Sequence, residues 1–358
     1  MPNTFQVKYF AEVDLNDHFF DSLKADYPKF ELWYKGKADK GTSAFVYTDG
    51  DNVGAFIYLK EETEEIPLQG TTLPAIPRIK IGTLKLDESI RNKRLGEGAL
   101  GLCLWRWRDA GVQQIYVTVY SKQGALINLL EKFGFYLAGY KEDGECVYIK
   151  DRNNIDISNP HKSFPFLPAS FRYGGIIPIH AQFHDQLFPY SELKNVHFIQ
   201  SAMENVAGNG VTKVYIATPR DLLQYYPGEP VVFYRISSEE YNRQYRSVVS
   251  SYGRVVNCVQ IRTPAGPLMK FDEYRKLVGN KSIFDESSLS RLYNSNRNVY
   301  VLELVYCGFF GAGNNVNYKT LKDEGLFEDY PYQIRYTSQQ YKRILEMGGI
   351  NVQTTFID

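Results

Sequence analysis

Hydrophobic and polar positions follow two different periods in the first 150 residues. Short runs rich in β-branched and aromatic residues predict strands at residues 4–10, 43–48, 53–59, 79–86, 115–119, 135–140 and 146–150. Apolar positions at helical spacing predict helices at 16–26, 95–111 and 124–133. The acidic and proline-containing residues 61–77 are expected to form a surface loop. Because strands and helices alternate along the chain, this part is predicted to be an α/β domain.

The pattern changes after residue 152. Residues 153–212 are first polar and then rich in Pro, Phe and His without a clear period, so they are expected to form an ordered linker. Beyond them, strands are predicted at 214–217, 230–236, 254–261 and 300–309, with short helices at 220–224, 271–278, 287–292 and 338–348. Mostly strands with short helices predict a small α+β β-barrel. The expected domains are therefore 1–152 and 213–358.

Composition adds limits to this picture. The chain has 358 residues, a length that favours two domains, and its 41 basic and 41 acidic residues cancel. It therefore lacks the overall positive charge that drives nonspecific nucleic-acid binding. No apolar run approaches the roughly 20 residues of a membrane span, and the first ten residues resemble no secretion signal, so we expect a cytoplasmic protein. Four cysteines at unpaired spacings predict reduced, mostly buried thiols: Cys103, Cys146, Cys258 and Cys307.

One pair of histidines has the spacing of metal ligands. His180 and His184, with Asp185 beside them, would share a face only if the segment were helical. Pro178 and the neighbouring glycines argue against a helix there. Without a third and a fourth ligand, no metal is expected.

A basic loop between a predicted strand and a predicted helix is a candidate anion site. It contains Arg91, Asn92, Lys93, Arg94 and Gly96. Free backbone N–H groups at a helix N-terminus and cationic side chains favour bound anions. Basic loops before helices are also common solvated features, so the loop has to be interpreted together with the sequence around it.

Two blocks of the first domain carry a family resemblance. The segment Arg91-Asn92-Lys93-Arg94-Leu95-Gly96 resembles the Arg/Gln-x-x-Gly-x-Gly/Ala motif of the GNAT superfamily of N-acetyltransferases. Residues 122–135 are similar to the helix of that family that ends in Tyr-Glu-Lys-x-Gly-Phe. Both blocks stand in the order and at the distance that the family has.

The resemblance implies that acetyl-CoA is the cosubstrate and that an amine accepts the acetyl group. In the family, backbone amides of the motif loop hold the pyrophosphate, and the preceding strand pairs with the pantetheine arm. The positions that would contact the cosubstrate are Leu84, Leu86, Arg91, Asn92, Lys93, Arg94, Leu95, Gly96, Glu97, Gln123 and Lys132.

The motif loop departs from the family at Arg94, which stands where the family has a glycine. If this position needs a positive φ, the side chain adds about 1 kcal/mol of strain. A shifted register over residues 93–98 restores two glycines but begins with a lysine. The first register is preferred because it lets the helix start near Leu95.

A second departure concerns catalysis. Leu130 occupies the place of the tyrosine that protonates the leaving thiolate in many family members. Direct transfer then needs other groups to position the amine and to move its proton. Glu88 is a candidate base, and Tyr120 and Ser121 are candidate acids. For each of them the ordinary alternative is a loop or core residue.

The second domain resembles the ASCH/PUA-like domains. The resemblance rests on residues 213–217 and on the turn Pro227-Gly228-Glu229, which leads into a strand ending in Phe-Tyr. It implies a pocket for RNA or a modified base. Six arginines near tyrosines are candidates for phosphate contacts and stacking, or else belong to the solvated face of an ordinary barrel: Arg220, Arg235, Arg243, Arg246, Arg254 and Arg262.

Two functions from different classes follow. The first is an acetyl-CoA-dependent N-acetyltransferase that transfers directly to an amine, with the second domain helping to select the acceptor. The alternative is a catalytically degenerate, CoA-binding GNAT domain in an RNA- or nucleotide-binding protein, which Leu130 favours. Membership of a toxin or stress system is a third possibility that no residue decides.

Overall fold

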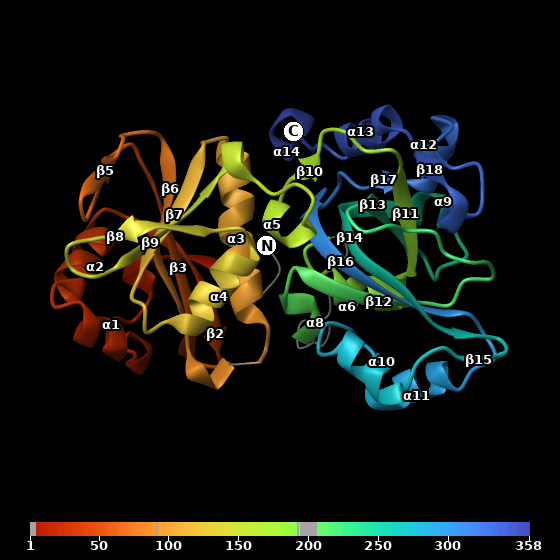
Figure 1. The fold of residues 1–358 in the computed structure, drawn as a ribbon, viewed down its shortest axis with the longest axis horizontal. Coiled ribbons are helices and arrows are strands. Elements are labelled where there is room, and N and C mark those ends of the chain that lie inside the picture. Colours follow the sequence, from red (N-terminus) through yellow and green to blue (C-terminus); the bar gives the residue numbers. More distant parts are fainter. Residues whose placement is uncertain (1–4, 91, 192, 194–205) are drawn as a thin grey trace. The chain divides into compact units, whose positions relative to one another are not determined.

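The computed structural model describes residues 5–90, 92–191, 193 and 206–358. The chain forms two compact units (Figure 1). Unit 1 comprises Met1–Glu131 with Phe135–Asn154, and unit 2 comprises Lys132–Gly134 with Ile155–Asp358. Among the helices in the described part of the chain, none has the length and apolar character needed to cross a membrane.

Unit 1 is built on a seven-stranded mixed sheet with the order β1-β2-β3-β6-β7-β9-β8. Its strands are β1 (Gln6–Tyr9), β2 (Ser43–Asp49), β3 (Asn52–Glu62), β6 (Arg78–Leu86), β7 (Gln114–Val119), β8 (Tyr136–Tyr140) and β9 (Cys146–Asp151). The central pair of β6 and β7 is parallel, and the other neighbouring strands are antiparallel. All seven were predicted, with ends displaced by a few residues at most.

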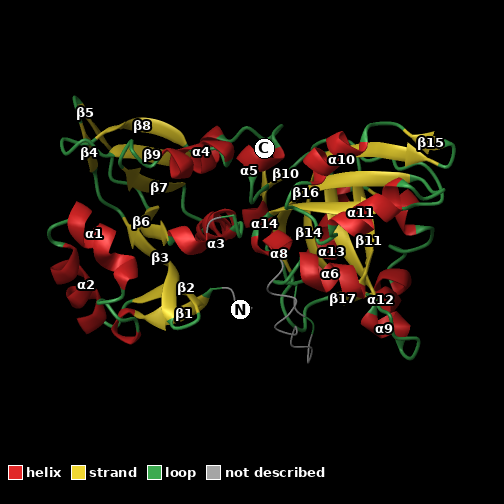
Figure 2. Cartoon of the chain, turned by 90° about the horizontal axis from the view of Figure 1, so that it is seen from below, coloured by secondary structure: helices red, strands yellow, loops and turns green. Residues whose placement is uncertain are grey.

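Helices cover both faces of this sheet. Figure 2 shows α1 (Asp21–Asp26) and α2 (Phe30–Asp39) on one side and α3 (Leu95–Ala110) on the other. A fourth helix, α4 (Gly124–Lys132), follows β7. Helix α2 was not predicted, because its buried residues are spread among lysines and a glycine. Its Phe30 and Tyr34 pack in an aromatic core with Phe10 and Phe56.

The loop expected at residues 61–77 contains a small hairpin of β4 (Ile66–Leu68) and β5 (Thr71–Leu73). Ile66 and Leu68 are buried against Tyr116 and Val147. The prolines and acidic residues around this hairpin interrupt the alternation of apolar and polar residues. The expectation of a surface loop was therefore wrong for the hairpin, whose Ile66 and Leu68 are buried.

Unit 2 has a sheet with the order β12-β16-β14-β13-β11-β18, to which β15 and β17 add at β14. Its strands are β11 (Gly174–His180), β12 (Thr212–Ala217), β13 (Pro230–Ile236), β14 (Val248–Thr263), β15 (Gly266–Pro267), β16 (Val299–Phe309), β17 (Val316–Asn317) and β18 (Arg335–Tyr336). Over the described residues the sheet does not close into the expected barrel. The sheet is nevertheless strongly curled. Three strands separate β12 from β11 in the sheet order, yet the hydroxyl of Tyr215 on β12 donates to the carbonyl of Pro178 on β11 at 3.3 Å.

Short helices and a second two-stranded sheet surround this curled sheet. The helices are α5 (Pro160–Ser163), α6 (Ala181–Leu187), α8 (Val206–Asn209), α9 (Arg243–Arg246), α10 (Phe271–Val278), α11 (Glu286–Tyr293), α12 (Tyr318–Asp323), α13 (Ser338–Met347) and α14 (Val352–Thr355). Strands β10 (Leu167–Pro168) and β19 (Phe356–Ile357) pair in parallel. The helices predicted at 271–278, 287–292 and 338–348 are present, whereas residues 220–224 form no helix.

The segment expected to be a linker contributes a strand to unit 2. Strand β11 lies between β13 and β18, and pairs with β13 in parallel. Its glycines and proline disguise a buried run in which Ile176 and Ile177 are fully enclosed. A side chain at Gly175 would crowd its neighbours, because a Cβ there would lie 2.7 Å from both the ring of Tyr225 and the Oε1 atom of Glu229.

Candidate functional site

The two parallel strands at the centre of unit 1 separate before they end. Strands β6 and β7 pair only from Arg78 and Gln114 to Ile81 and Val117. Beyond this point, and within the described residues, residues 82–86 pair with β3 alone and residues 118–119 pair with β9 alone. The backbone edges that face the opening therefore have no partner strand. An extended ligand with amide groups can pair with such an edge as an added strand does.

A bulge in β6 explains where the strands separate. The register between β3 and β6 shifts at Tyr58 and Leu59, which pair with Thr83 and Ile81 and leave Gly82 as the extra residue. A bulge bends its strand and increases its twist. The lack of a side chain at Gly82 is required, since a Cβ would lie 2.8 Å from the ring of Tyr58. The two strands therefore separate next to a bulge in β6.

The predicted motif loop lies at the end of β6 and leads into α3. Helix α3 starts at Leu95, as the preferred register requires, and its N-cap Arg94 has a φ of 56°. Asn92 also has a positive φ, of 68°. Left-handed residues alternating with ordinary ones turn successive N–H groups toward one point, and the first turn of a helix adds its own N–H groups. Arg91 lies outside the described residues.

Arg94 has the positive φ that its place in the motif led us to consider, at a position where the family has a glycine. A left-handed residue other than glycine carries about 1 kcal/mol of strain. The Arg94 side chain folds back on the helix and pairs with Glu97 at 3.0 Å, and both side chains are largely buried. Lys93 pairs with Asp49 of β2 at 3.0 Å. Both cations of the described loop thus have an acidic partner that a bound anion would compete with.

The first turn of α3 lies over the end of β6 and beside α4. A Cβ built on Gly96 would lie 3.8 Å from side-chain atoms of both Leu86 and Leu129. Leu84 is two residues before Leu86 in the strand and therefore points to the same face. Leu84, Leu86, Leu95, Gly96 and Glu97 are thus brought together at one end of the opening.

The remaining predicted positions are spread more widely. Tyr120 and Ser121 directly follow β7, and the Gln123 N–H donates to the Tyr120 carbonyl at 2.9 Å. Glu88 is exposed in a 3-10 turn after β6. Lys132 ends α4, where its ammonium lies 5.3 Å from the centre of the Phe133 ring.

Leu130 is fully buried in α4, and the N–H of Phe135 donates to its carbonyl at 3.0 Å. The residue is a packing residue of the helix that borders the opening. Glu131, the next residue, accepts a hydrogen bond from the Tyr148 hydroxyl of β9 at 3.2 Å.

Sequence reasoning missed a polar cluster at the same end of β7. Tyr27, just after α1, stacks near Tyr120 with ring centres 5.8 Å apart. Its hydroxyl donates to Glu145 at 3.1 Å, and the ammonium of Lys141 donates to the other Glu145 oxygen at 2.7 Å. Burial, and then the charge of Glu145, raise the pKa of Tyr27. No motif marks these residues, because they come from three separate elements.

Lys85 faces the same side as this cluster. Its ammonium donates to Ser22 of α1 at 2.6 Å and to the Phe19 carbonyl. Burial lowers its pKa, against the raising effect of nearby aspartates.

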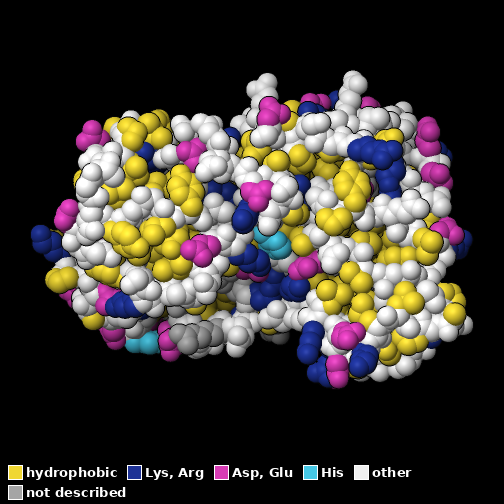
Figure 3. Space-filling model, in the orientation of Figure 1, with side chains coloured by type: hydrophobic (Ala, Val, Ile, Leu, Met, Phe, Trp, Pro, Cys, Tyr) yellow, Lys and Arg dark blue, Asp and Glu magenta, His cyan; other side chains and the backbone are white. Residues whose placement is uncertain are grey.

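Figure 3 also shows apolar side chains gathered over the edge strand β8, which lies beside β9 and where Tyr136, Leu137 and Tyr140 are exposed.

The predicted RNA-contacting arginines of unit 2 divide into two groups. Arg235 makes two hydrogen bonds to Asp185, at 2.7 and 2.8 Å. Arg254 is buried and donates to the carbonyls of Gly228 and Ile157, and Arg262 donates to the carbonyl of Tyr293. These three side chains are thus held by partners within unit 2. Arg220, Arg243 and Arg246 are exposed.

The histidine pair has no common ligand position. His184 is buried, and its two ring nitrogens lie 2.9 Å from Asp185 and 2.7 Å from the Ser250 hydroxyl. His180 is exposed at the start of α6. Both nitrogens of His184 are therefore used in a buried hydrogen-bond network. Within the described ranges, no group of three His, Cys, Asp or Glu side chains has the geometry of a metal site.

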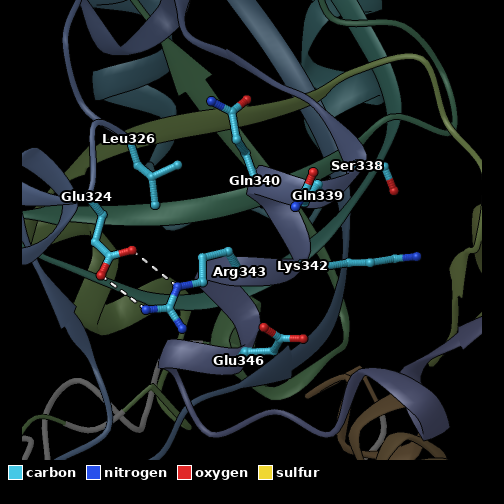
Figure 4. Close-up of a pocket in the computed structure, with 8 residues that line it drawn as sticks. All are labelled: Glu324, Leu326, Ser338, Gln339, Gln340, Lys342, Arg343 and Glu346. Atoms are coloured by element: carbon cyan, nitrogen blue, oxygen red, sulfur yellow. Dashed lines mark hydrogen bonds and ion pairs between the residues drawn. The ribbon is translucent and has the colours of Figure 1, made fainter.

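A surface depression in unit 2 is less suited to binding a ligand than the opening in unit 1. Figure 4 shows it beside α13, with Arg343 making two hydrogen bonds to Glu324, at 3.0 and 3.2 Å. Apart from the buried Leu326, its lining consists of exposed or half-exposed polar side chains. Its one arginine is already paired, so the opening in unit 1 remains the candidate site.

No family model matches this sequence, and no curated protein matches it. Solved structures similar to part of the chain include Ard1 from Thermoplasma volcanium, with 16% identity over 41% of this chain and 95% of that chain at a TM-score of 0.30. An N-acetyltransferase from Staphylococcus aureus Mu50 has 16% identity, 41% and 98% coverage and a TM-score of 0.30. A NatC complex bound to Gag peptide and CoA has 15% identity, 42% and 99% coverage and a TM-score of 0.28.

Proposed function

We propose that unit 1 is an acetyl-CoA-dependent N-acetyltransferase of the GNAT type. The observation that carries this proposal is the separation of β6 and β7 beyond Ile81 and Val117, with the N-terminus of α3 at the end of the opening. A strand edge and a helix N-terminus side by side suit a ligand with an amide-containing arm and a phosphorylated end. Acetyl-CoA has both parts.

The two parts of the cosubstrate have separate partners in this proposal. The edge of residues 82–86 pairs with the amides of the pantetheine arm, with Leu84 and Leu86 beside it. The pyrophosphate lies against backbone N–H groups of residues 92–97, where Lys93 adds positive charge. Gln123 and Lys132, near the two ends of α4, are proposed to complete the site from the other side.

Transfer to an amine needs only direct attack. The nitrogen lone pair forms the new C–N bond, the C–S bond breaks, and the electron pair leaves with sulfur. The proton that nitrogen loses neutralises the thiolate, so an amide and CoA result. Tyr120 and Ser121, at the end of β7, are proposed to donate to the thiolate in place of the missing tyrosine, and Glu88 is the candidate base.

Unit 2 is proposed to take part in selecting the acceptor, as a PUA-like module. A specific observation keeps nucleic-acid binding as the second candidate function: Tyr241 and Tyr245 are 79% and 51% exposed and flank Arg243. Exposed rings beside an arginine can stack on unpaired bases. Retention of single-stranded RNA on a filter at low salt, lost in a Tyr241→Ala/Tyr245→Ala double variant, would support it. No retention would remove it.

Hydrogen exchange of the full chain tests the proposed cosubstrate site. Added acetyl-CoA should slow the exchange of amides in residues 82–86 and 92–97, because the open edge and the helix start gain hydrogen-bond partners. Strand β16 of unit 2 is the internal control and should not change. Slowed exchange elsewhere, with these two segments unchanged, would refute the assignment.

A further inference from the structure

Lys85 lies on the part of β6 that has separated from β7. Within the described part of the chain, residues 82–86 pair with β3 alone, and the proposed pantetheine arm runs along their open edge. Leu86 points to the face covered by α3, since it lies next to Gly96. Side chains alternate along a strand, so Lys85 points to the opposite face. The backbone of Lys85 therefore borders the arm, while its side chain lies across the sheet from the motif loop.

The amine of Lys85 is held by two neutral oxygens. It donates to the Ser22 hydroxyl of α1 at 2.6 Å and to the carbonyl of Phe19. The nitrogen also lies 4.6 Å from the centre of the Phe19 ring. A lysine ammonium has three donor positions, and these two partners use two of them. When the third proton is lost, the lone pair takes the remaining position, and the two hydrogen bonds fix its direction.

Three other lysines around the opening each pair with a carboxylate: Lys93 with Asp49, Lys122 with Asp26 and Lys141 with Glu145. A carboxylate stabilises the charged ammonium, which has no lone pair and cannot act as a nucleophile. Lys85 is half-buried, and burial lowers its pKa although nearby aspartates oppose this effect. Among these four lysines, Lys85 is thus the one that most readily becomes a neutral amine.

We propose that unit 1 transfers an acetyl group to its own Lys85. This inference rests on the proposed function, because the acetyl group comes from acetyl-CoA bound along residues 82–86. The pantetheine arm has two amides, so it pairs with only a few residues of this edge before the thioester is reached. A thioester in this stretch lies beside the backbone of Lys85, and the flexible four-carbon side chain can bring its nitrogen to the reacting carbon.

The transfer needs no reactant besides the cosubstrate and water. The Lys85 ammonium first loses one proton to water. Its lone pair then forms a C–N bond with the thioester carbon, the C–S bond breaks, and the electron pair leaves with sulfur. The second nitrogen proton neutralises the thiolate. The products are CoA, a Lys85 side chain that carries an Nε-acetyl group, and one released proton.

Acetylation of Lys85 would weaken the attachment of α1 to β6. The amide of the modified side chain has one N–H and no charge, so it can keep only one of its two hydrogen bonds. All six residues of α1 are at least partly exposed, so contacts such as that of Ser22 help to hold the helix in place. Hydrogen exchange in α1 should therefore be faster in the acetylated protein. Unchanged exchange there would contradict this consequence.

Mass spectrometry of the full chain incubated with isotopically labelled acetyl-CoA tests the proposal. Peptide mapping should find the label on Lys85 about tenfold more often than on Lys40, an exposed lysine that reports uncatalysed acetylation. The rate at Lys85 should be the same in dilute and in concentrated protein, because donor and acceptor belong to one chain. A rate that grows with protein concentration would assign the transfer to a second copy and overturn the inference.

Gly96→Asp separates catalysed from uncatalysed labelling. This variant should bind acetyl-CoA more weakly at the start of α3, so labelling of Lys85 should fall several-fold while Lys40 stays at the wild-type level. Unlabelled acetyl groups already present on Lys85 count as the same modification when the variant lacks them. Equal labelling of Lys85 in Gly96→Asp and the wild type would overturn the inference.

The affinity of the wild type for acetyl-CoA distinguishes the two possible failures. Labelling of Lys85 no higher than that of Lys40, in a protein that binds acetyl-CoA, would overturn the inference and leave the proposed function standing. A wild-type protein that does not bind acetyl-CoA would instead overturn the proposed function itself.

Discussion

Ile81 of β6 and Val117 of β7 form the last rung between the two parallel strands at the centre of unit 1. Each strand continues beyond this rung with its other neighbour, so the sheet opens without losing its outer pairs. The helix that follows β6 starts beside the open end. The proposed cosubstrate site therefore depends on a register, on a bulge at Gly82 and on the start of α3.

Gly96 offers a direct test of the helix start. Gly96→Asp places a negative charge in the first turn of α3, where it favours the helix but repels a bound pyrophosphate. The affinity for acetyl-CoA should fall at least tenfold, which corresponds to about 1.4 kcal/mol, while the melting temperature stays or rises. Gly96→Asn is the matched neutral control and should lose less affinity. Equal affinities for both variants in isothermal titration would contradict the placement of the pyrophosphate.

Lys93 is the described cation of the motif loop that is most accessible to an anion. It is paired with Asp49, and its side chain is 40% exposed. Lys93→Ala should weaken acetyl-CoA binding by a few-fold, since an exposed charge contributes about 1 kcal/mol or less. The effect should shrink as salt is added, because screening weakens the interaction. Lys40→Ala, at an exposed lysine after α2, should have no effect in the same titration.

Most strands of unit 1 could be predicted because their apolar residues are continuous and their turns are marked by Gly, Asp and Asn. The opening itself could not, since it depends on which residues of β6 find a partner in β7. Strand β11 was missed because Gly174, Gly175 and Pro178 interrupt its apolar run. The pairing of Tyr27 with Glu145 spans 118 positions in the sequence, and no local pattern indicates it.

Glu229 should make unit 2 sensitive to pH. Burial raises the pKa of its carboxyl to about 7, from an ordinary 4.5. Between these pH values the folded chain keeps a proton that the unfolded chain releases, so this residue lowers the free energy of unfolding as pH rises. The full loss corresponds to about 3 kcal/mol. Glu229→Gln should therefore gain stability relative to wild type as pH rises through this window.

Urea unfolding followed by circular dichroism at several pH values measures this difference. Glu328→Gln replaces an exposed carboxylate of the same unit and should follow the wild type at every pH. A constant difference in stability between Glu229→Gln and the wild type from pH 4.5 to 7 would show that Glu229 is ionised throughout.

Ser250 and His184 form a buried pair whose loss should destabilise unit 2. Ser250→Ala leaves the Nε2 atom of His184 without its partner at 2.7 Å, which should cost about 1–3 kcal/mol. Burial lowers the pKa of His184, so the neutral ring is the form that the folded chain holds. The contribution of His184 to the free energy of unfolding is therefore present above its ordinary pKa of 6.5 and is lost as the pH falls below that value. Ser238→Ala, at an exposed serine, is the control. Thermal unfolding at neutral pH should separate the two variants clearly.

Isothermal titration of the full chain with acetyl-CoA tests the central claim most directly. A site made from the free edge of residues 82–86 and the start of α3 should bind acetyl-CoA with one site per chain and micromolar affinity, and Gly96→Asp should weaken that binding. Absence of binding by the wild-type protein at hundreds of micromolar acetyl-CoA would contradict the account.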